Sequence, residues 1–183
     1  MKKDEFLYEE FVEEKEKTVL LLNGPSSSGK STLTEVLQNH LRESINKEYG
    51  SCSIDEFLKM TPEEEIFEED VFEISTMIGE KALRELESKD GVIVDHVITS
   101  ERIFQRLKEM LADYRMICIR VTCPIEELRR REAARGNRCP GSAEASYEYL
   151  YPQNGYDVTV DTYEMSLQEC CEKILKAMEY QDV

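Results

Sequence analysis

A glycine- and serine-rich loop near the start of the chain contains the residues with the clearest chemical role. It matches the pattern G-x-x-x-x-G-K-[ST] and, with the residue that follows, comprises Gly24, Pro25, Ser26, Ser27, Ser28, Gly29, Lys30, Ser31 and Thr32. The backbone N–H groups of such a loop converge on the β-phosphate of a nucleotide, and the following helix adds its positive end. Lys30 supplies a cation to the β- and γ-phosphates, and Ser31 offers a hydroxyl to Mg²⁺. The loop predicts binding of a nucleoside triphosphate with Mg²⁺, a property that kinases, GTPases and motor ATPases share.

Two aspartates follow short apolar segments that are typical of buried strands. Asp55 comes just after residues 50–54, and Asp95 directly follows residues 92–94. Ligands of an open parallel sheet collect at the carboxyl ends of its strands. One carboxylate is a candidate to accept the proton of an attacking hydroxyl, and the other to hold Mg²⁺ directly or through water. The alternative role of either residue is to cap a helix. His96 is interpreted as a structural residue, with contact to a substrate as the alternative.

The one dense basic segment lies in the last third of this acidic chain. Its arginines are Arg129, Arg130, Arg131, Arg135 and Arg138. A helix would place the last three on one side, and Gly136 allows a hinge beside them. We interpret Arg135 and Arg138 as part of a lid that neutralises the γ-phosphoryl oxygens and excludes water. The first two arginines are interpreted as solvated residues paired to nearby glutamates.

An acidic cluster lies between the second and third apolar segments. Its members are Glu63, Glu64, Glu65, Glu68, Glu69, Asp70 and Glu73. The pattern favours a solvated helix surface. Contact with a cationic substrate and electrostatic docking of the arginine lid are the alternatives.

The elements that must position these residues alternate along the chain. Short apolar segments predict strands at 18–23, 50–54, 92–94, 116–121 and 157–161, and helical spacing predicts helices at 32–41, 67–86, 103–111, 125–134 and 167–178. This alternation predicts βαβ crossovers and a parallel sheet covered on both faces. We therefore expect one α/β domain over 18–183, preceded by an acidic arm over 1–17.

Length and charge agree with one acidic domain. The chain has 183 residues, 40% of them apolar, and a formal net charge of −16. The acidic balance argues against nucleic acid or an anionic membrane as partner, since either needs a basic footprint. No apolar segment approaches the ~20 residues of a membrane span, and the charged N-terminus does not resemble a signal peptide. We expect a cytoplasmic protein whose six cysteines, which include no C-x-x-C pair, are reduced thiols.

Five segments together resemble the chloramphenicol phosphotransferase-like family of P-loop kinases. They are VLLLNGPSSSGKST, SCSIDEFLKMTP, GVIVDHV, IRVTCPIEELRRREAARGNR and YDVTVDTYEMSLQECCEKI, within about residues 18–177. The resemblance implies a fold like that of shikimate kinase and nucleotide monophosphate kinases, with five parallel strands in the order 2-3-1-4-5. It implies ATP-dependent phosphorylation of a hydroxyl group on a small molecule. It makes Asp55 the catalytic base, Lys30 the phosphate-binding lysine, Arg135 and Arg138 the lid arginines, and Asp95 the acid at the end of the third strand.

Two departures from the antibiotic kinase concern the acceptor. The segment over 60–73 is shorter and more acidic, and Asp95 is followed by His96 where the antibiotic kinase has a second acid. The sequence therefore does not assign chloramphenicol as the substrate. The expected partners are ATP and a small hydroxylated acceptor, in a monomer or a homodimer. The alternatives are a nucleotide, nucleoside or nucleotide-sugar kinase of the same fold and a non-catalytic ATP-binding switch.

Overall fold

The computed structural model describes residues 17–58, 67–136 and 140–179. Almost all of the expected acidic arm lies outside these residues, as do Arg138, Cys139 and the first three glutamates of the acidic cluster. The strands are β1 Thr18–Asn23, β2 Tyr49–Ser53, β3 Gly91–His96, β4 Arg115–Thr122 and β5 Val158–Asp161. The helices are α1 Lys30–Ile45, α2 Ile54–Phe57, α3 Glu68–Ser88, α4 Glu101–Met110, α5 Ile125–Arg135, α6 Ser142–Glu148 and α7 Leu167–Glu179.

The five strands form one parallel sheet in the order β2-β3-β1-β4-β5, as predicted. The central strand β1 is buried along its whole length, which explains why its sequence, TVLLLN, has no polar alternation. The register pairs Leu22 of β1 with Asp95 of β3. The carboxyl end of β3 therefore lies level with the start of the phosphate loop.

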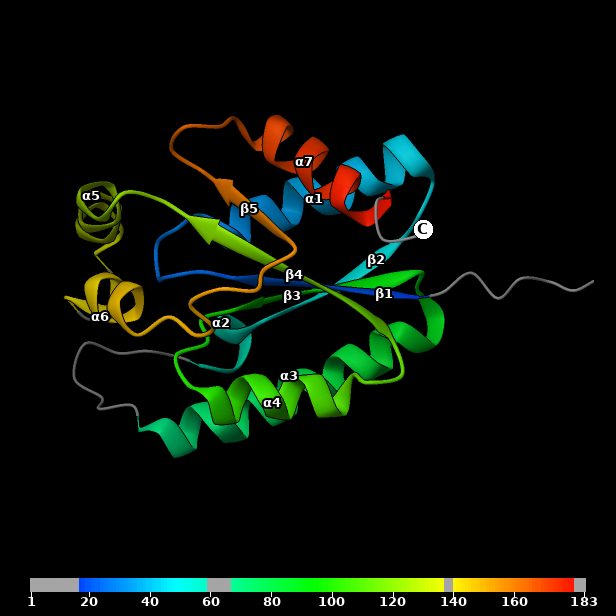
Figure 1. The fold of residues 1–183 in the computed structure, drawn as a ribbon, viewed down its shortest axis with the longest axis horizontal. Helices are drawn as coiled ribbons and strands as arrows, with labels where there is room; N and C mark the ends of the chain where they lie inside the picture. The colour runs from blue at the N-terminus through cyan, green and yellow to red at the C-terminus, as the bar shows by residue number, and fades with distance from the viewer. Residues whose placement is uncertain (1–16, 59–66, 137–139, 180–183) are drawn as a thin grey trace, which may run out of the picture.

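Helices cover both faces of the sheet (Figure 1). Leu20 and Leu22 of β1 belong to a core with α1 and α7. Val19 and Leu21 point the other way, into a core with α3 and α4. Successive side chains of a strand point to opposite faces, so one apolar strand supports two helical layers.

Two short elements differ from the expectation. The second strand ends at Ser53, and Ile54 opens α2 instead of continuing the strand. The Ser53 hydroxyl accepts a hydrogen bond from the Asp55 backbone N–H (3.3 Å), and Glu56 accepts one from the Ser53 N–H (2.9 Å). This reciprocal capping box starts the helix. No sequence pattern predicted α6, which packs against α5 to form the α5–α6 hairpin at the carboxyl edge of the sheet (Figure 1).

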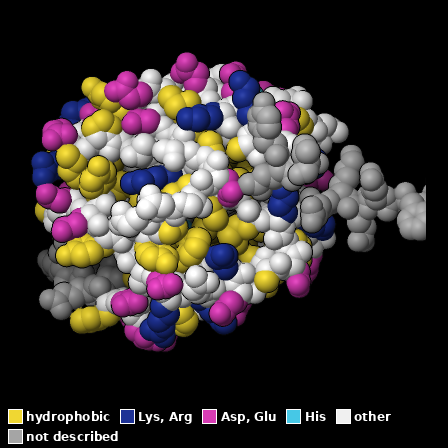
Figure 2. All heavy atoms as spheres, viewed as in Figure 1, with side chains coloured by type: hydrophobic (Ala, Val, Ile, Leu, Met, Phe, Trp, Pro, Cys, Tyr) yellow, Lys and Arg dark blue, Asp and Glu magenta, His cyan; other side chains and the backbone are white. Residues whose placement is uncertain are grey.

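Charged side chains of both signs are spread over the face shown in Figure 2, and apolar side chains gather in its middle. The five described cysteines are free thiols. Burial raises the pKa of Cys52 to about 12, so this thiol behaves as a small apolar side chain. Among the described residues, no helix combines the length and apolar character that crossing a bilayer requires.

Candidate active site

A cavity of about 450 Å³ opens at the carboxyl edge of the sheet. It is lined by Ser26, Ser27, Gly29, Lys30, Ser31, Ile54, Asp55, Leu58, Glu68, Val71, Asp95, Val97, Thr99, Ser100, Ile103, Arg135, Ser142, Ala145, Ser146 and Tyr149. The lining combines the phosphate loop with α2, the start of α3, the β3–α4 segment and the α5–α6 hairpin. The cavity therefore brings together loop residues, both predicted aspartates and one predicted lid arginine.

The phosphate loop approaches the neighbouring strand too closely for a side chain at its first position. A Cβ atom on Gly24 would collide with the carbonyl oxygen of Val121 in β4. Gly29, directly before α1, has φ of 90°, a left-handed conformation that glycine adopts without steric cost. Both glycines of the motif are thus required by backbone geometry.

Lys30 is buried beneath this loop. Its Nζ atom donates hydrogen bonds to the carbonyl oxygens of Gly24 and Pro25, both at 2.9 Å. These bonds hold the ammonium group in the curve of the loop, where charge-assisted bonds to phosphate oxygens would form.

Asp95 is 2% exposed and lies directly beside the first turn of α1. Its Oδ2 atom accepts hydrogen bonds from the hydroxyls of Ser31 (2.8 Å) and Ser53 (3.4 Å). Burial raises the pKa of Asp95, an effect that the charge of Lys30 and the Ser31 hydrogen bond oppose. Asp95 therefore orients the Ser31 hydroxyl.

Ser31 and Asp95 together fit the predicted Mg²⁺ site. One hydroxyl and one carboxylate suit an ion that otherwise keeps water and phosphate oxygens as ligands. Within the described parts of the chain, no group of three or more His, Cys, Asp or Glu residues is arranged to hold a metal by itself. An Mg²⁺ ion at this place would depend on the nucleotide for further ligands.

Asp55 lies in the first turn of α2 with its side chain exposed to the cavity. The Ser53 hydroxyl links it to the other aspartate, since this hydroxyl donates to Asp95 and accepts from the Asp55 N–H. A continuous chain of hydrogen bonds thus runs from Ser31 through Asp95 and Ser53 to the backbone of Asp55. The two aspartates share one site, although only Asp55 is open to solvent.

His96 is fully buried and is not part of the cavity lining. The hydroxyl of Ser75 in α3 donates its proton to the Val71 carbonyl (2.6 Å), so its oxygen accepts from Nε2 of His96 (2.8 Å). Burial lowers the pKa of His96 to about 4, and the nearby charge of Lys30 acts in the same direction. This neutral side chain packs α3 against β3, in agreement with the structural interpretation.

Of the two predicted lid arginines, the structure describes one. Arg135, the last residue of α5, is exposed and lines the cavity. Arg138 lies outside the described residues. Arg130 forms a surface ion pair with Glu127 (2.6 Å), as interpreted, whereas Arg129 pairs with Glu144 of α6. One arginine of this segment therefore reaches the cavity within the described chain.

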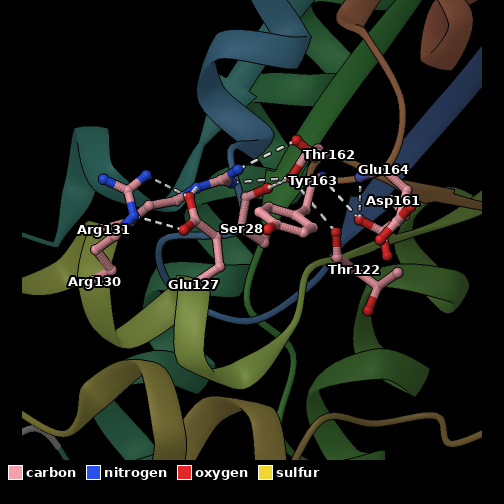
Figure 3. Close-up of polar contacts among 9 residues, drawn as sticks. All are labelled: Ser28, Thr122, Glu127, Arg130, Arg131, Asp161, Thr162, Tyr163 and Glu164. Carbon is pink, nitrogen blue, oxygen red and sulfur yellow. Dashed lines mark hydrogen bonds and ion pairs between the residues drawn. The ribbon is translucent and has the colours of Figure 1, made fainter.

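Sequence reasoning missed the role of Arg131, which Figure 3 shows reaching from α5 towards the phosphate loop. Its Nε donates to Glu127 (2.8 Å), and its Nη1 donates to the hydroxyl of Thr162 (3.0 Å). The Thr162 hydroxyl in turn donates to the carbonyl oxygen of Ser28 (2.6 Å). This connection ties the middle of α5 and the residue after β5 to the phosphate loop. The helix ends at Arg135, so the predicted helical side with three arginines comprises Arg131 and Arg135 within the described residues, and the spacing did not indicate the partner of Arg131.

A second missed connection joins α6 to the phosphate loop. The backbone N–H of Ser26 donates to the hydroxyl of Ser146 in α6 (2.9 Å). Glu132 of α5 accepts hydrogen bonds from the backbone of Gly141 (3.0 Å) and from the Ser142 hydroxyl (2.7 Å) at the start of α6. The α5–α6 hairpin is therefore held together internally, and its helix α6 contacts the loop through Ser146.

The described members of the acidic cluster have separate roles. Glu69 pairs with Arg102 through two hydrogen bonds of 2.7 and 3.1 Å. Asp70 accepts a hydrogen bond from the Phe67 N–H (3.0 Å) at the start of α3. The described members, including Glu73, are all exposed on α3, as predicted for a solvated helix surface, and Glu68 in addition lines the cavity.

Asn23, at the end of β1, anchors the wall of the cavity formed by residues 97–103. Its Oδ1 accepts from the Ile98 N–H (2.9 Å), and its Nδ2 donates to the Tyr151 carbonyl (2.8 Å). The Tyr151 N–H donates to the Ile98 carbonyl (2.9 Å). A buried amide with all these groups paired holds the two segments together. No motif in the sequence indicated this residue.

Comparison with known proteins connects this geometry to a family. A family model for the chloramphenicol phosphotransferase-like proteins matches residues 17–179. No curated protein sequence matches the chain.

Among solved structures, similar folds include an APS kinase from Mycobacterium tuberculosis in complex with AMPPNP and APS (16% identity, TM-score 0.67), a gluconokinase from Sinorhizobium meliloti 1021 (20%, 0.66) and a shikimate kinase from Acinetobacter baumannii in complex with shikimate (19%, 0.57). These matches cover 90%, 91% and 91% of this chain and 98%, 98% and 96% of the other chains, respectively. At such low identities the likeness establishes the fold alone, and this fold is that of P-loop kinases.

Proposed function

The chain belongs to the chloramphenicol phosphotransferase-like family, and from this premise we propose that it transfers the γ-phosphoryl group of Mg·ATP to a hydroxyl group of a small molecule. One observation carries the proposal: a single cavity is lined by Lys30 and Ser31 of the phosphate loop and by the carboxylate of Asp55. A switch protein that only binds ATP has no need of a solvent-open carboxylate in the same cavity as the phosphate loop.

The proposed reaction assigns Asp55 to the acceptor. The acceptor hydroxyl lies against Asp55, which orients it and takes its proton. A bond forms between the acceptor oxygen and the γ-phosphorus while the bond from this phosphorus to the β,γ-bridging oxygen breaks, and ADP leaves. Since the transition state of phosphoryl transfer is loose, orientation is the larger part of this role.

The remaining residues act on the phosphates. Lys30 exchanges its two carbonyl partners for phosphate oxygens, and Arg135 neutralises charge on the transferring group. Ser31 and Asp95 would hold Mg²⁺, which when bound neutralises phosphate charge. Arg138 stays a predicted second lid arginine, because it lies outside the described residues.

Two alternatives make different demands on the cavity. A nucleotide or nucleotide-sugar kinase needs cations for the phosphate of its acceptor, and the lining from α2, α3 and residues 97–103 includes no lysine or arginine among the described residues. A non-catalytic switch would use the contact between Ser26 and Ser146, through which movement of α6 reaches the phosphate loop. The switch gives Asp55 no catalytic role, whereas a nucleoside or nucleotide-sugar kinase would use it to orient an acceptor hydroxyl.

The test is transfer of label from γ-labelled ATP with Mg²⁺ into a pool of hydroxylated metabolites, nucleosides and antibiotics. The pool includes APS, gluconate, shikimate and chloramphenicol. We expect one acceptor class to be labelled, and Asp55→Asn to lower kcat by about 10²–10⁴-fold while ATP still binds. Asp113→Asn is the matched control, because Asp113 is an exposed residue outside the cavity lining. If Asp55→Asn transferred label as fast as the natural protein, Asp55 would not be the base, and Asp95 would become the candidate. ATP binding without label transfer in any pool would favour the switch.

A further inference from the structure

The cavity has two parts of different chemistry. One part contains the phosphate loop and the α5–α6 hairpin. The other, which we call the acceptor half, consists of the lining residues Ile54, Asp55, Leu58, Glu68, Val71, Val97, Thr99, Ser100 and Ile103. In the proposed reaction the acceptor half surrounds the molecule that carries the hydroxyl.

The walls of the acceptor half are mainly apolar. Leu58 comes from the end of α2, Val71 from the first turns of α3, and Ile103 from the first turn of α4. These side chains also belong to the core between the sheet and α3–α4, which gives the walls a fixed position. An acceptor with an apolar body gains free energy by covering them.

The described ionisable side chains that line the acceptor half are all acidic. Its ionisable residues are Asp55 and Glu68, and it includes no lysine or arginine among the described residues. Arg102 lies nearby, but its guanidinium makes its two hydrogen bonds with Glu69 and covers the Phe72 ring at 3.8 Å. The electrostatic field in this half of the cavity therefore favours a cation and opposes an anion.

We propose, on the basis of the proposed function, that the acceptor is an amino alcohol: its hydroxyl lies at Asp55, its apolar body covers Leu58, Val71 and Ile103, and its ammonium group pairs with Glu68. Asp55 must be ionised to accept a hydroxyl proton, so it adds to the attraction for the ammonium group. An acceptor that carries a carboxylate or phosphate would place this anion against two carboxylates.

The test compares acceptors that share an apolar body and differ in charge. Phenylalaninol carries an ammonium group, N-acetylphenylalaninol is uncharged, and tropic acid carries a carboxylate. Each represents a pool of its charge class, and transfer of label from γ-labelled ATP is measured for each pool. We expect most transfer to the amino alcohols, less to the uncharged alcohols, and background transfer to the hydroxy acids.

A charge-neutralising variant connects the preference to one side chain. Glu68→Gln should raise KM for the amino alcohol about fivefold relative to KM for the uncharged alcohol. This is the change in affinity expected from the loss of one partly exposed ion pair. Glu73→Gln is the matched control, since Glu73 is an exposed residue of the same helix that does not line the cavity. This variant should leave the ratio of the two KM values unchanged.

The possible results separate the two proposals. Transfer that is strongest to hydroxy acids, or an equal effect of Glu68→Gln and Glu73→Gln on the ratio of KM values, would overturn the amino alcohol while leaving the phosphotransferase proposal intact. Bound ATP without transfer to any pool would overturn the phosphotransferase proposal itself, and the amino-alcohol inference with it.

Discussion

The phosphate loop and the α5–α6 hairpin face the same cavity but are stabilised by different kinds of interaction. On the loop side, Lys30 and Asp95 are 6% and 2% exposed, and buried hydrogen bonds connect them to the backbone of the loop and to Ser31. On the hairpin side, Arg129, Arg130 and Arg135 are exposed, and the first two form surface ion pairs. On the loop side, the charged groups are already held in fixed positions. On the hairpin side, the surface ion pairs can be exchanged at little cost in free energy.

The difference follows from the environment of the charges. A buried polar group without a partner costs about 1–3 kcal/mol, so the arrangement around Lys30 tolerates few alternatives. An exposed ion pair contributes about 0–1 kcal/mol, so the surface ion pairs within the hairpin can be exchanged at little cost in free energy. In the proposed reaction the loop side binds the phosphates, and the hairpin side adjusts to them.

The largest expected effect comes from removing the cation on each side of the cavity, Lys30 on the loop side and Arg135 on the hairpin side. Lys30→Met should lower kcat/KM for phosphoryl transfer about 10³-fold, because it removes a buried charge directed at the phosphates. Arg135→Ala should cost less, about 10²-fold, and mainly in kcat, because in the proposed reaction this exposed arginine acts only on the charge of the transferring group. Steady-state kinetics with the labelled acceptor measure both values.

The control for these variants is Arg130→Ala on the same helix. Arg130 pairs with Glu127 on the surface and does not line the cavity, so its loss should change kcat/KM less than about twofold. The comparison of the two sides fails if Arg135→Ala is as damaging as Lys30→Met, or if Arg130→Ala matches Arg135→Ala.

The second prediction compares two glycines, one on each side. Gly24→Ala should reduce the free energy of unfolding by about 3 kcal/mol, because the new methyl group collides with the backbone of Val121. Gly141→Ala should cost about 1 kcal/mol, the strain of its φ of 87°, since no atom lies within 4 Å of the added Cβ. Urea unfolding measures both. Equal losses would show that the loop side is no more tightly packed than the hairpin.

The third and smallest prediction concerns the stability in acid that depends on His96, which is buried between β3 and α3. The pKa of His96 is about 4 in the folded protein, whereas its ordinary value, which applies to the unfolded chain, is 6.5. Between pH 4 and 6.5 the unfolded chain therefore binds more protons at this residue than the folded protein does. The contribution of His96 is therefore present above pH 6.5 and is lost as pH falls towards 4. Between pH 6.5 and 4.5 this group alone should lower the free energy of unfolding by about 2 kcal/mol.

His96→Gln isolates this contribution. The variant should lose stability less steeply than the natural protein over the same range of pH, whatever its stability at pH 7. His40→Gln, at the other and partly exposed histidine, is the control. An unchanged slope in His96→Gln would mean that burial of His96 does not contribute to acid sensitivity.

Sequence reasoning was most successful where one local pattern determines the structure. The apolar segments located all five strands, and their alternation with helices led to the parallel sheet and, through the family resemblance, to its strand order. The phosphate motif likewise located the turn between β1 and α1, because its glycines are required by backbone geometry within the motif. Local periodicity was too weak for α6, whose seven residues include only two buried side chains, Ala143 and Ser146.

The candidate site was predictable as a set of residues but not as a set of contacts. Asp55 and Asp95 were placed correctly at the carboxyl edge, yet their connection through Ser53 depends on the capping box of α2. Arg131 was counted with the other arginines, but its contact with Thr162 joins residues 31 positions apart in sequence. Such contacts depend on how α5 packs against the end of β5, which no local spacing encodes.

By itself, the sequence determined the alternating strands and helices, the phosphate-binding loop and the two aspartates that follow strands, because each depends on a short-range pattern. The kinase fold and its strand order followed from the family resemblance. Only the tertiary structure decided which charges are buried, and it alone brought Arg131 to Thr162 beside the phosphate loop. It also brought Glu68 into an acceptor half otherwise formed by α2 and residues 97–103. The physical reason is that burial and electrostatic field depend on all the groups around a side chain, and most of those groups come from distant parts of the sequence.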